Sequence, residues 1–269
     1  MTAVILQNHV QAAVRAFHRR LFRRPIPRKL GLYLHSTSGQ QVRLEELVCF
    51  LLEHRYAFIG PDAFASSTDQ VVFLSFDDNY RSWLDVLPLF ERYGVRATFY
   101  VNSWPFCDRV SNAEVCSYFE RLKVSSREET TLSTGDLREI AGAGHWIGAH
   151  THTHPVLTSL SERLAREEIR VGKEELERIL QHPVKHFSYP FGMRRHFNRS
   201  LRAYCRAIGF STVAHAIPCM QYARNRPGEL HRSAWFLNQP LEFNLANVCV
   251  DGRLFEALTG RSAVGGDPH

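Results

Sequence analysis

No run of 18 apolar residues occurs in the 269-residue chain, so a transmembrane helix is not expected. The start of the chain also lacks the short apolar block and the small-residue cleavage site that mark a secretory signal. The six cysteines form no CxxC pair. In a chain without an export signal they are expected to be reduced thiols, with a local Cys107–Cys116 bridge as the alternative. These absences favour a cytoplasmic protein.

Acidic residues are absent from residues 1–29, which carry seven Lys or Arg. The rest of the chain is close to neutral, with 26 basic against 27 acidic residues, so nucleic acid is not expected as a partner. Four apolar residues of the first segment recur at helical spacing: Val10, Val14, Phe17 and Leu21. They predict a basic amphipathic helix. It either packs on the following domain or makes a weak contact with the inner membrane surface through residues 1–24.

Beyond residue 29, apolar runs alternate with amphipathic stretches, as strands and helices do in βα units. Strands are predicted at residues 30–35, 71–78, 95–101, 145–150, 186–192 and 210–215. Helices are predicted at residues 43–55, 81–93, 135–143, 159–180 and 196–208. The alternation predicts an α/β fold whose parallel sheet is either closed as a barrel or open.

Residues 102–131 follow neither a helical nor a strand period, and they interrupt this rhythm. A stretch of that length without regular structure is usually a functional or mobile loop. The domain organisation predicted is therefore one catalytic domain over residues 30–259, with an insertion at 102–131. A flexible Gly-rich tail is expected at 260–269.

Polar side chains stand at the carboxyl ends of several predicted strands, where parallel βα folds place their ligands. The sharpest case is Asp77 followed by Asp78. Neighbouring residues of a strand point in different directions, so one carboxylate can bind a divalent cation while the other takes a proton from water. Taken alone, the pair is as well explained by a solvated turn or by the N-cap of helix 81–93.

The segment HTHTHP at residues 150–155 favours the metal over the turn. His150 and His154 are four residues apart at a junction between a strand and a helix, so both rings can reach one ion, with His152 pointing away. Two histidines and one aspartate make a three-ligand site with positions left open for water and substrate. Zinc suits this mixture of imidazole and carboxylate, and cobalt, nickel or another divalent metal is the alternative.

Four segments together resemble the polysaccharide deacetylases, also called the NodB-homology family or carbohydrate esterase family 4. They are LYLHS (32–36), FDD (76–78), HTHTHP (150–155) and FSYPFG (187–192), the last in the F-x-Y-P-[YF]-G form of one branch. The resemblance covers roughly residues 30–240. It implies a distorted (β/α)7-type barrel that hydrolyses an N-acetyl group on an amino sugar.

The resemblance also implies roles for single residues. Asp77 would be the general base, and Asp78, His150 and His154 would hold the metal. The backbone N–H of Phe191 would bind the oxyanion. The other residues expected to contact substrate are His35, Asn79, Tyr189 and Pro190.

The second half of the chain departs from the family pattern. The arginine that opens the third motif in some branches is absent, with Ser188 nearby, and the histidine of the fifth motif has no clean match. The segment ELHRSAW (229–235) is similar to a family segment that would make Arg232 the residue that orients the base. His231 is then the first candidate for the general acid and His215 the second.

Three functions are compatible with these patterns. The favoured one is an N-deacetylase of an amino-sugar small molecule, a lipid-linked sugar or an oligosaccharide. An alternative keeps the metal site but acts on a non-sugar amide, as deformylases and allantoinases do. The third is a catalytically silent carbohydrate-binding protein, although such a protein has little reason to keep both acids and both histidines.

Overall fold

The structure is a computed structural model that describes residues 26–125, 129–217 and 227–248. The predicted N-terminal helix within residues 1–24 and the predicted tail at 260–269 lie outside this range. Within it, no helix is both long and apolar enough to cross a membrane.

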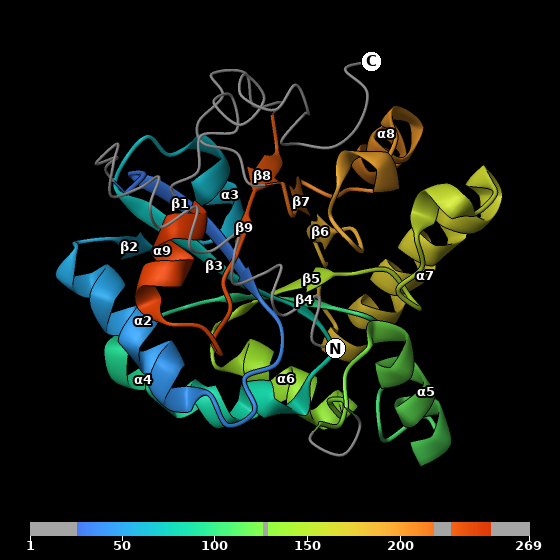
Figure 1. The fold of residues 1–269 in the computed structure, drawn as a ribbon. Helices are drawn as coiled ribbons and strands as arrows, with labels where there is room; N and C mark the ends of the chain where they lie inside the picture. Colours follow the sequence, from blue (N-terminus) through green and yellow to red (C-terminus); the bar gives the residue numbers. More distant parts are fainter. Residues whose placement is uncertain (1–25, 126–128, 218–226, 249–269) are drawn as a thin grey trace, which may run out of the picture.

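A parallel sheet forms the centre of the molecule, in the order β8-β7-β6-β5-β4-β3-β1-β9 (Figure 1). Its strands are β1 (Lys29–Leu34), β3 (Val71–Asp78), β4 (Thr98–Val101), β5 (Trp146–Ala149), β6 (His186–Ser188), β7 (Thr212–His215), β8 (Glu229–His231) and β9 (Ser233–Ala234). The short β2 (Ala57–Phe58) pairs with β3 outside this path.

The two ends of the sheet are consecutive in the chain. Only Arg232 separates β8, which pairs with β7, from β9, which pairs with β1. The sheet therefore nearly closes on itself. With β8 and β9 counted as one position, the barrel has seven strand positions, which confirms the predicted distorted (β/α)7 barrel.

Helices surround the barrel on its outer side (Figure 1). They are α2 (Gln41–Glu53), α3 (Pro61–Ser66), α4 (Leu87–Tyr93), α5 (Asn112–Leu122), α6 (Thr134–Gly142), α7 (Glu162–Leu180), α8 (Arg199–Ala207) and α9 (Leu241–Val248). The helix predicted at 81–93 is instead a 3₁₀ helix at Arg81–Val86 followed by α4. Pro88 has no backbone N–H and is tolerated only in a first helical turn, so a new helix begins beside it.

The segment 102–131 contains a regular helix that was not predicted, although Val115, Tyr118, Phe119 and Leu122 recur in it at helical spacing. Helix α5 begins with a capping box, in which the Ser111 side chain accepts from the Glu114 N–H while the Glu114 carboxylate accepts from the Ser111 N–H. The sequence S-x-x-E is the known signature of this device. The prediction of an unstructured insertion was therefore wrong over residues 112–122.

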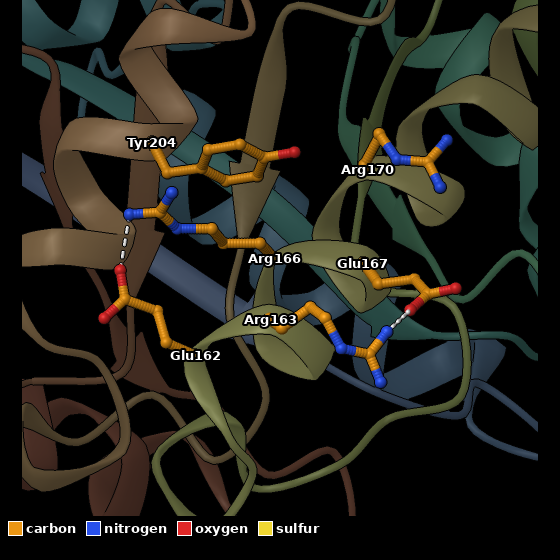
Figure 2. A pocket seen from close by; sticks show the side chains of 6 residues that line it. All are labelled: Glu162, Arg163, Arg166, Glu167, Arg170 and Tyr204. Carbon is orange, nitrogen blue, oxygen red and sulfur yellow. Dashed lines mark hydrogen bonds and ion pairs between the residues drawn. The ribbon is translucent and has the colours of Figure 1, made fainter.

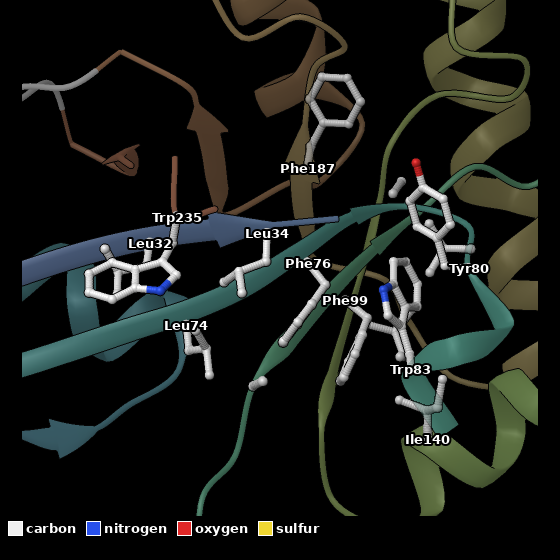
Figure 3. Packing of buried hydrophobic residues seen from close by; sticks show 14 of the residues in the cluster. Leu32, Leu34, Leu74, Phe76, Tyr80, Trp83, Phe99, Ile140, Phe187 and Trp235 are labelled. Carbon is white, nitrogen blue, oxygen red and sulfur yellow. The ribbon is translucent and has the colours of Figure 1, made fainter. Parts of the chain in front are cut away.

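All eight residues of β3 are buried, and the two faces of the strand serve different cores. On the outer face, Phe76 stacks on Phe99 with ring centroids 5.0 Å apart, and Trp83 packs beside them (Figure 3). On the inner face, Phe73 lies in a cluster with Tyr100 and with side chains from β7 and β8. Because β3 and β4 are not neighbours of β7 and β8, these contacts cross the barrel interior.

The inner face of β3 changes from apolar to polar along its length. Val71 and Phe73 belong to the interior cluster, where Phe64 of α3 packs against Phe73 at 5.4 Å between ring centroids. Further along the same face come Ser75 and Asp77, both buried. The barrel interior is therefore filled with apolar side chains toward the amino ends of the strands, and the polar groups collect at the carboxyl ends.

Candidate active site

Asp77 and Asp78 end β3 and point to different partners, as adjacent residues of a strand do. Both are buried, at 5% and 4% exposure. Asp78 has φ at +87°, a conformation that is unfavourable for a residue with a Cβ. Thr151, His154 and Phe191 also have positive φ, at 68°, 64° and 62°. Residues in such strained conformations cluster at functional sites.

Arg232 fixes the orientation of the Asp77 carboxylate. The two guanidinium nitrogens of Arg232 donate to the two carboxylate oxygens of Asp77, at 2.6 and 2.8 Å. The same nitrogens donate to the hydroxyls of Ser75 and Ser188, at 2.9 and 2.7 Å. Burial disfavours the Asp77 anion, but the Arg232 charge outweighs it and holds the pKa of Asp77 below its ordinary value. Asp77 is therefore an ionised carboxylate with a fixed orientation.

Arg232 is itself fully buried, and its guanidinium lies 5.1 Å from the ring centroids of both Tyr33 and Tyr100. Aromatic faces stabilise a buried cation, and the paired carboxylate supplies the counter-charge. Arg232 stands between β8 and β9, at the point where the chain changes its pairing partner from β7 to β1. Arg232 crosses the barrel interior and links its closing edge to the end of β3.

Asp78 faces the two histidines of the HTHTHP segment. Its Oδ1 lies 3.5 Å from His150 Nε2 and 3.2 Å from His154 Nε2. His150 Nδ1 is 2.8 Å from the Ser188 carbonyl oxygen, which can only accept, so Nδ1 carries a proton. In a neutral His150, Nε2 then presents a lone pair toward a carboxylate. A cation between them would satisfy both. Metal-binding histidines also commonly make the contact seen here on the other ring nitrogen, from Nδ1 to a backbone carbonyl oxygen.

The loop that carries His154 is fixed by helix α7. The Glu168 carboxylate accepts from the backbone N–H groups of His152 and Thr153, at 3.1 and 2.8 Å. Gly172 allows this close approach, because a Cβ there would lie 2.7 Å from the Thr151 carbonyl carbon. The His152 ring turns away from Asp78 and contacts the Ser103 hydroxyl at 2.8 Å.

Helix α5 supports the same site from the other side. The Tyr118 hydroxyl donates to the Asn102 side-chain oxygen at 2.8 Å, and the Asn102 amide donates to the His150 carbonyl. The Tyr80 hydroxyl donates to Asp78 Oδ2 at 3.2 Å. The sequence motifs did not predict the contacts of Tyr80 and Tyr118, because the candidate site residues were sought at strand ends and neither tyrosine is in a strand.

A cavity of about 650 Å³ opens above Asp77 and Asp78. Its lining includes both histidines of the HTHTHP segment, His35, Tyr189 and Phe191. Trp235 and Phe236, which follow β9, and Arg121 and Lys123, at the end of α5, also contribute. The carboxylates, the histidines and the exposed aromatic rings therefore meet in one space large enough for a sugar-sized ligand.

The two histidines proposed as general acid lie elsewhere. His215 of β7 and His231 of β8 are register partners with ring centroids 4.1 Å apart, and neither lines the cavity. Side chains alternate along a strand, so with Arg232 pointing into the barrel the preceding His231 points outward. Burial lowers the pKa of His231 to about 4 and that of His215 well below its ordinary value. The prediction of either as acid is corrected by this placement.

His35 is the histidine that the structure brings to the cavity instead. Its side chain is 50% exposed, and its Nε2 lies 4.0 Å from Asp78 Oδ2. The Tyr33 ring packs against it edge-on at 5.6 Å. His35 was predicted as a substrate contact, and its position on the cavity wall suits that role or a proton-transfer role.

The remaining predicted contacts divide into two groups. Tyr189 and the half-exposed Phe191 line the cavity. Asn79 is fully buried, with its amide donating to the Asn102 carbonyl and its oxygen accepting from the Leu132 N–H. Pro190 is buried and does not line the cavity. Asn79 therefore ties two loops together, which corrects its prediction as a substrate contact.

A second groove lies between α7 and α8 and is lined by Arg163, Arg166, Arg170, Glu162, Glu167 and Tyr204 (Figure 2). Each of its arginines forms an ion pair with a glutamate four residues away on α7. The charges are therefore satisfied within one helix face, as on many solvated helices. The groove has no converging catalytic groups.

Comparisons with known proteins agree with the geometry. A family model described as polysaccharide deacetylase matches residues 65–213. A chitin deacetylase of Colletotrichum lindemuthianum is 24% identical over 195 residues, which are 71% of this chain and 68% of that protein. The fold is similar to the Streptococcus pyogenes deacetylase PplD, solved in complex with acetate. That match has a TM-score of 0.62 at 18% identity and covers 82% of this chain and 98% of that one. It is also similar to IcaB from Ammonifex degensii, with a TM-score of 0.60 at 18% identity over 82% of this chain and 96% of that one.

Proposed function

Since the chain belongs to the polysaccharide deacetylase family, a group of hydrolytic deacetylases that act on amide bonds, we propose that it is a metal-dependent N-deacetylase of an amino-sugar-containing substrate. The observation that carries the proposal is the meeting of two units on one cavity floor. One is Asp77 clamped by Arg232, and the other is the cluster of Asp78, His150 and His154.

Asp78, His150 and His154 are the residues that would hold the metal. Their ligand atoms lie within 4.8 Å of one another, and two nitrogens with one oxygen are a donor set suited to zinc, cobalt or nickel. When bound, the cation supplies Lewis-acid chemistry, which polarises the scissile carbonyl and makes a nearby water more acidic. Asp78 and His150 are buried, and His154, whose side chain is 11% exposed, faces the cavity.

Asp77 is the general base of the proposal. Its ionised carboxylate accepts a proton from the attacking water, and Arg232 keeps it from rotating away. The backbone N–H of Phe191, at a positive φ on the cavity wall, is proposed to donate to the oxyanion. Water adds to the carbonyl carbon, the C–N bond breaks, and acetate and a free amine are the products.

We assign His35 as the proton donor to the leaving amine. A general acid must reach the substrate, and His35 lines the cavity beside Asp78, whereas His215 and His231 face away from it. Tyr189 and the exposed ring of Phe191 are proposed to contact the sugar. His35 therefore takes the role that the sequence predicted for His231.

The test is Asp77→Asn in the metal-loaded protein. Acetate release from N-acetylated hexosamine substrates should fall by about a thousandfold or more, because an amide cannot accept the proton. Metal content by elemental analysis should stay at the wild-type value, since Asp78 and both histidines are untouched. Asp69→Asn, at an exposed position remote from the cavity, is the matched control and should keep full activity.

Retained activity in Asp77→Asn would overturn the role of Asp77. The substrate panel also separates the alternatives. Release from formyl or ureido amides but not from acetylated hexosamines would favour a non-sugar amide hydrolase. Binding of sugars without any hydrolysis would favour a silent binding protein.

A further inference from the structure

The cavity has one cationic wall that the proposed chemistry does not use. Arg121 and Lys123 stand at the end of α5, and both line the cavity that holds Asp77 and Asp78. The inference drawn from them rests on the proposed deacetylase function and concerns the substrate of the same site.

The end of α5 is held in a fixed position relative to the proposed metal site. The Tyr118 hydroxyl bonds Asn102, and the Phe119 ring stacks on Tyr80 with centroids 5.6 Å apart. The Tyr80 hydroxyl in turn donates to Asp78. Asn102 and Tyr80 thus connect the buried face of α5 to His150 and Asp78 within one or two contacts. The cations at its end are built into the site and do not belong to a loose loop.

Arg121 is oriented by an aromatic ring. Its guanidinium lies 5.1 Å from the centroid of the Trp104 ring, and the side chain remains exposed toward the cavity. Stacking of this kind limits the rotamers of a long side chain and leaves its N–H donors free. Lys123, with φ at +60°, ends the helix and places a second cationic group, an ammonium, on the same wall.

Neither cation has a carboxylate partner among the residues that the structure describes. The carboxylates lining the cavity over that range are Asp77, which Arg232 neutralises, and Asp78, which is assigned to the metal. The arginines of the α7 groove are the opposite case, because each is paired with a glutamate. Figure 2 shows two of these pairs, Arg163 with Glu167 and Arg166 with Glu162. Among the described residues that line the cavity, Arg121 and Lys123 are therefore two positive charges without a neutralising carboxylate.

Aromatic side chains form another part of the wall. Phe236 is 44% exposed and Phe191 is 50% exposed, and Trp235 lies next to Phe236 in the lining. Exposed aromatic faces suit the apolar face of a sugar ring, and arginine and lysine suit phosphate oxygens. The two kinds of surface together fit a sugar that carries an anion.

We propose that the amino-sugar substrate bears a phosphate group and that Arg121 and Lys123 bind it. The shared chemistry is a phosphorylated N-acyl amino sugar, which could be a free sugar phosphate, a nucleotide-linked sugar or a lipid-linked sugar. A neutral N-acetylglucosamine oligomer lacks the group that the cationic wall recognises.

The experiment compares Arg121→Gln/Lys123→Gln with the wild-type metal-loaded enzyme on four substrates. They are N-acetylglucosamine 1-phosphate, a nucleotide-diphosphate N-acetylglucosamine, a polyprenyl-diphosphate N-acetylglucosamine in detergent, and neutral diacetylchitobiose. The wild type should favour one or more of the phosphorylated substrates. The double variant should lose about tenfold in kcat/KM per cation on these substrates and change little on diacetylchitobiose. Arg163→Gln/Arg170→Gln on α7 removes the same charge outside the cavity and should behave as wild type.

Binding gives a readout that does not depend on turnover. The dissociation constant of N-acetylglucosamine 1-phosphate, measured by calorimetry on the Asp77→Asn protein, should rise at least tenfold when Gln replaces both cations. The wild-type rate on phosphorylated substrates should also fall with added salt, while that on diacetylchitobiose should not. Among the three phosphorylated compounds, the one with the highest kcat/KM identifies the source of the phosphate.

Equal losses on neutral and phosphorylated substrates, or unchanged phosphate binding in the double variant, would overturn the inference. Either result would leave Arg121 and Lys123 as cations that stabilise the end of α5. Absence of hydrolysis with every substrate would instead refute the proposed function, and the calorimetric arm would still decide whether this wall binds phosphate.

Discussion

Two clusters of histidine and carboxylate lie at the same end of the barrel, and they differ in what surrounds them. Asp78, His150 and His154 form one, and His215, Glu229 and His231 form the other; in each, the ligand atoms lie within 4.8 Å of one another. The first cluster opens into the cavity. In the second, Glu229 is already ion-paired with Arg202 of α8, and the side chains point away from the barrel interior.

The comparison teaches that the face of a strand decides what a polar residue can do. Both clusters have the same residue types near strand ends, so composition and position along the chain do not separate them. Arg232 separates them: it points inward to Asp77, which forces its neighbour His231 outward. A chemically suitable residue on the wrong face cannot reach the substrate.

Replacing the two histidines of each cluster with glutamine is the most direct test of the difference between the clusters. His150→Gln/His154→Gln should lower activity by more than a thousandfold and remove bound metal, because two of the three proposed ligands are lost. His215→Gln/His231→Gln should keep the metal and most of the activity, with a loss of thermal stability. Elemental analysis and acetate release measured on the same preparations provide the test. Loss of metal in the second variant alone would reverse the assignment of the clusters.

The proton donor is the next point at which the two regions can be compared. His35→Gln should lower kcat by about a hundredfold, within the usual range for a general acid, without loss of metal. His231→Gln should change kcat by less than threefold, since its ring does not line the cavity. Steady-state kinetics on an N-acetylated hexosamine substrate distinguish the two. A larger effect at His231 than at His35 would restore the assignment made from the sequence.

The sequence alone was sufficient to predict most of the barrel and the floor of the site. Apolar runs located β1 and β3 to within one residue at either end, and the HTHTHP spacing predicted that His150 and His154 lie together near Asp78, in a group that could hold a metal ion. These features depend on local periodicity and short spacing. Both can be read from neighbouring residues of the sequence without knowledge of the fold.

Other features depend on contacts between distant segments. The inward direction of Arg232 follows from its partner Asp77, 155 residues earlier in the chain. Helix α5 is a different case, because local signals do mark it: Val115, Tyr118, Phe119 and Leu122 recur at helical spacing, and the Ser111–Glu114 capping box stands at its start. The buried role of Asn79 depends on two backbone partners, one of them 53 residues away. No local pattern reports such pairings.

Arg232 can be tested as a positioning residue. Arg232→Lys keeps the charge but cannot donate two parallel hydrogen bonds, so Asp77 should lose its fixed orientation. We expect a ten- to thirtyfold lower kcat with KM nearly unchanged, when kcat is calculated from the concentration of folded, metal-loaded enzyme so that an unfolded fraction does not count as a loss. Arg232→Met, which leaves the Asp77 charge buried without a partner, should destabilise the fold by about 3 kcal/mol or more. A change in KM alone for Arg232→Lys would argue against a positioning role.

His145 supplies the smallest effect, and it concerns a histidine that belongs to neither cluster. Its ring packs between Phe90 and Phe99, and Nδ1 accepts from the Ala97 N–H at 3.1 Å. Burial lowers the pKa of His145 to about 4. Between that value and the ordinary histidine pKa of about 6.5, the unfolded chain binds a proton that the folded chain does not. Its contribution to stability is therefore lost as the pH falls through this window, with a slope of at most about 1.4 kcal/mol per pH unit. His145→Gln should be less stable than wild type at pH 7.5, but its free energy of unfolding in urea should fall less steeply between pH 6.5 and 4.5. Equal slopes for the two proteins would show that His145 is protonated in the folded state and that its burial does not hold it neutral.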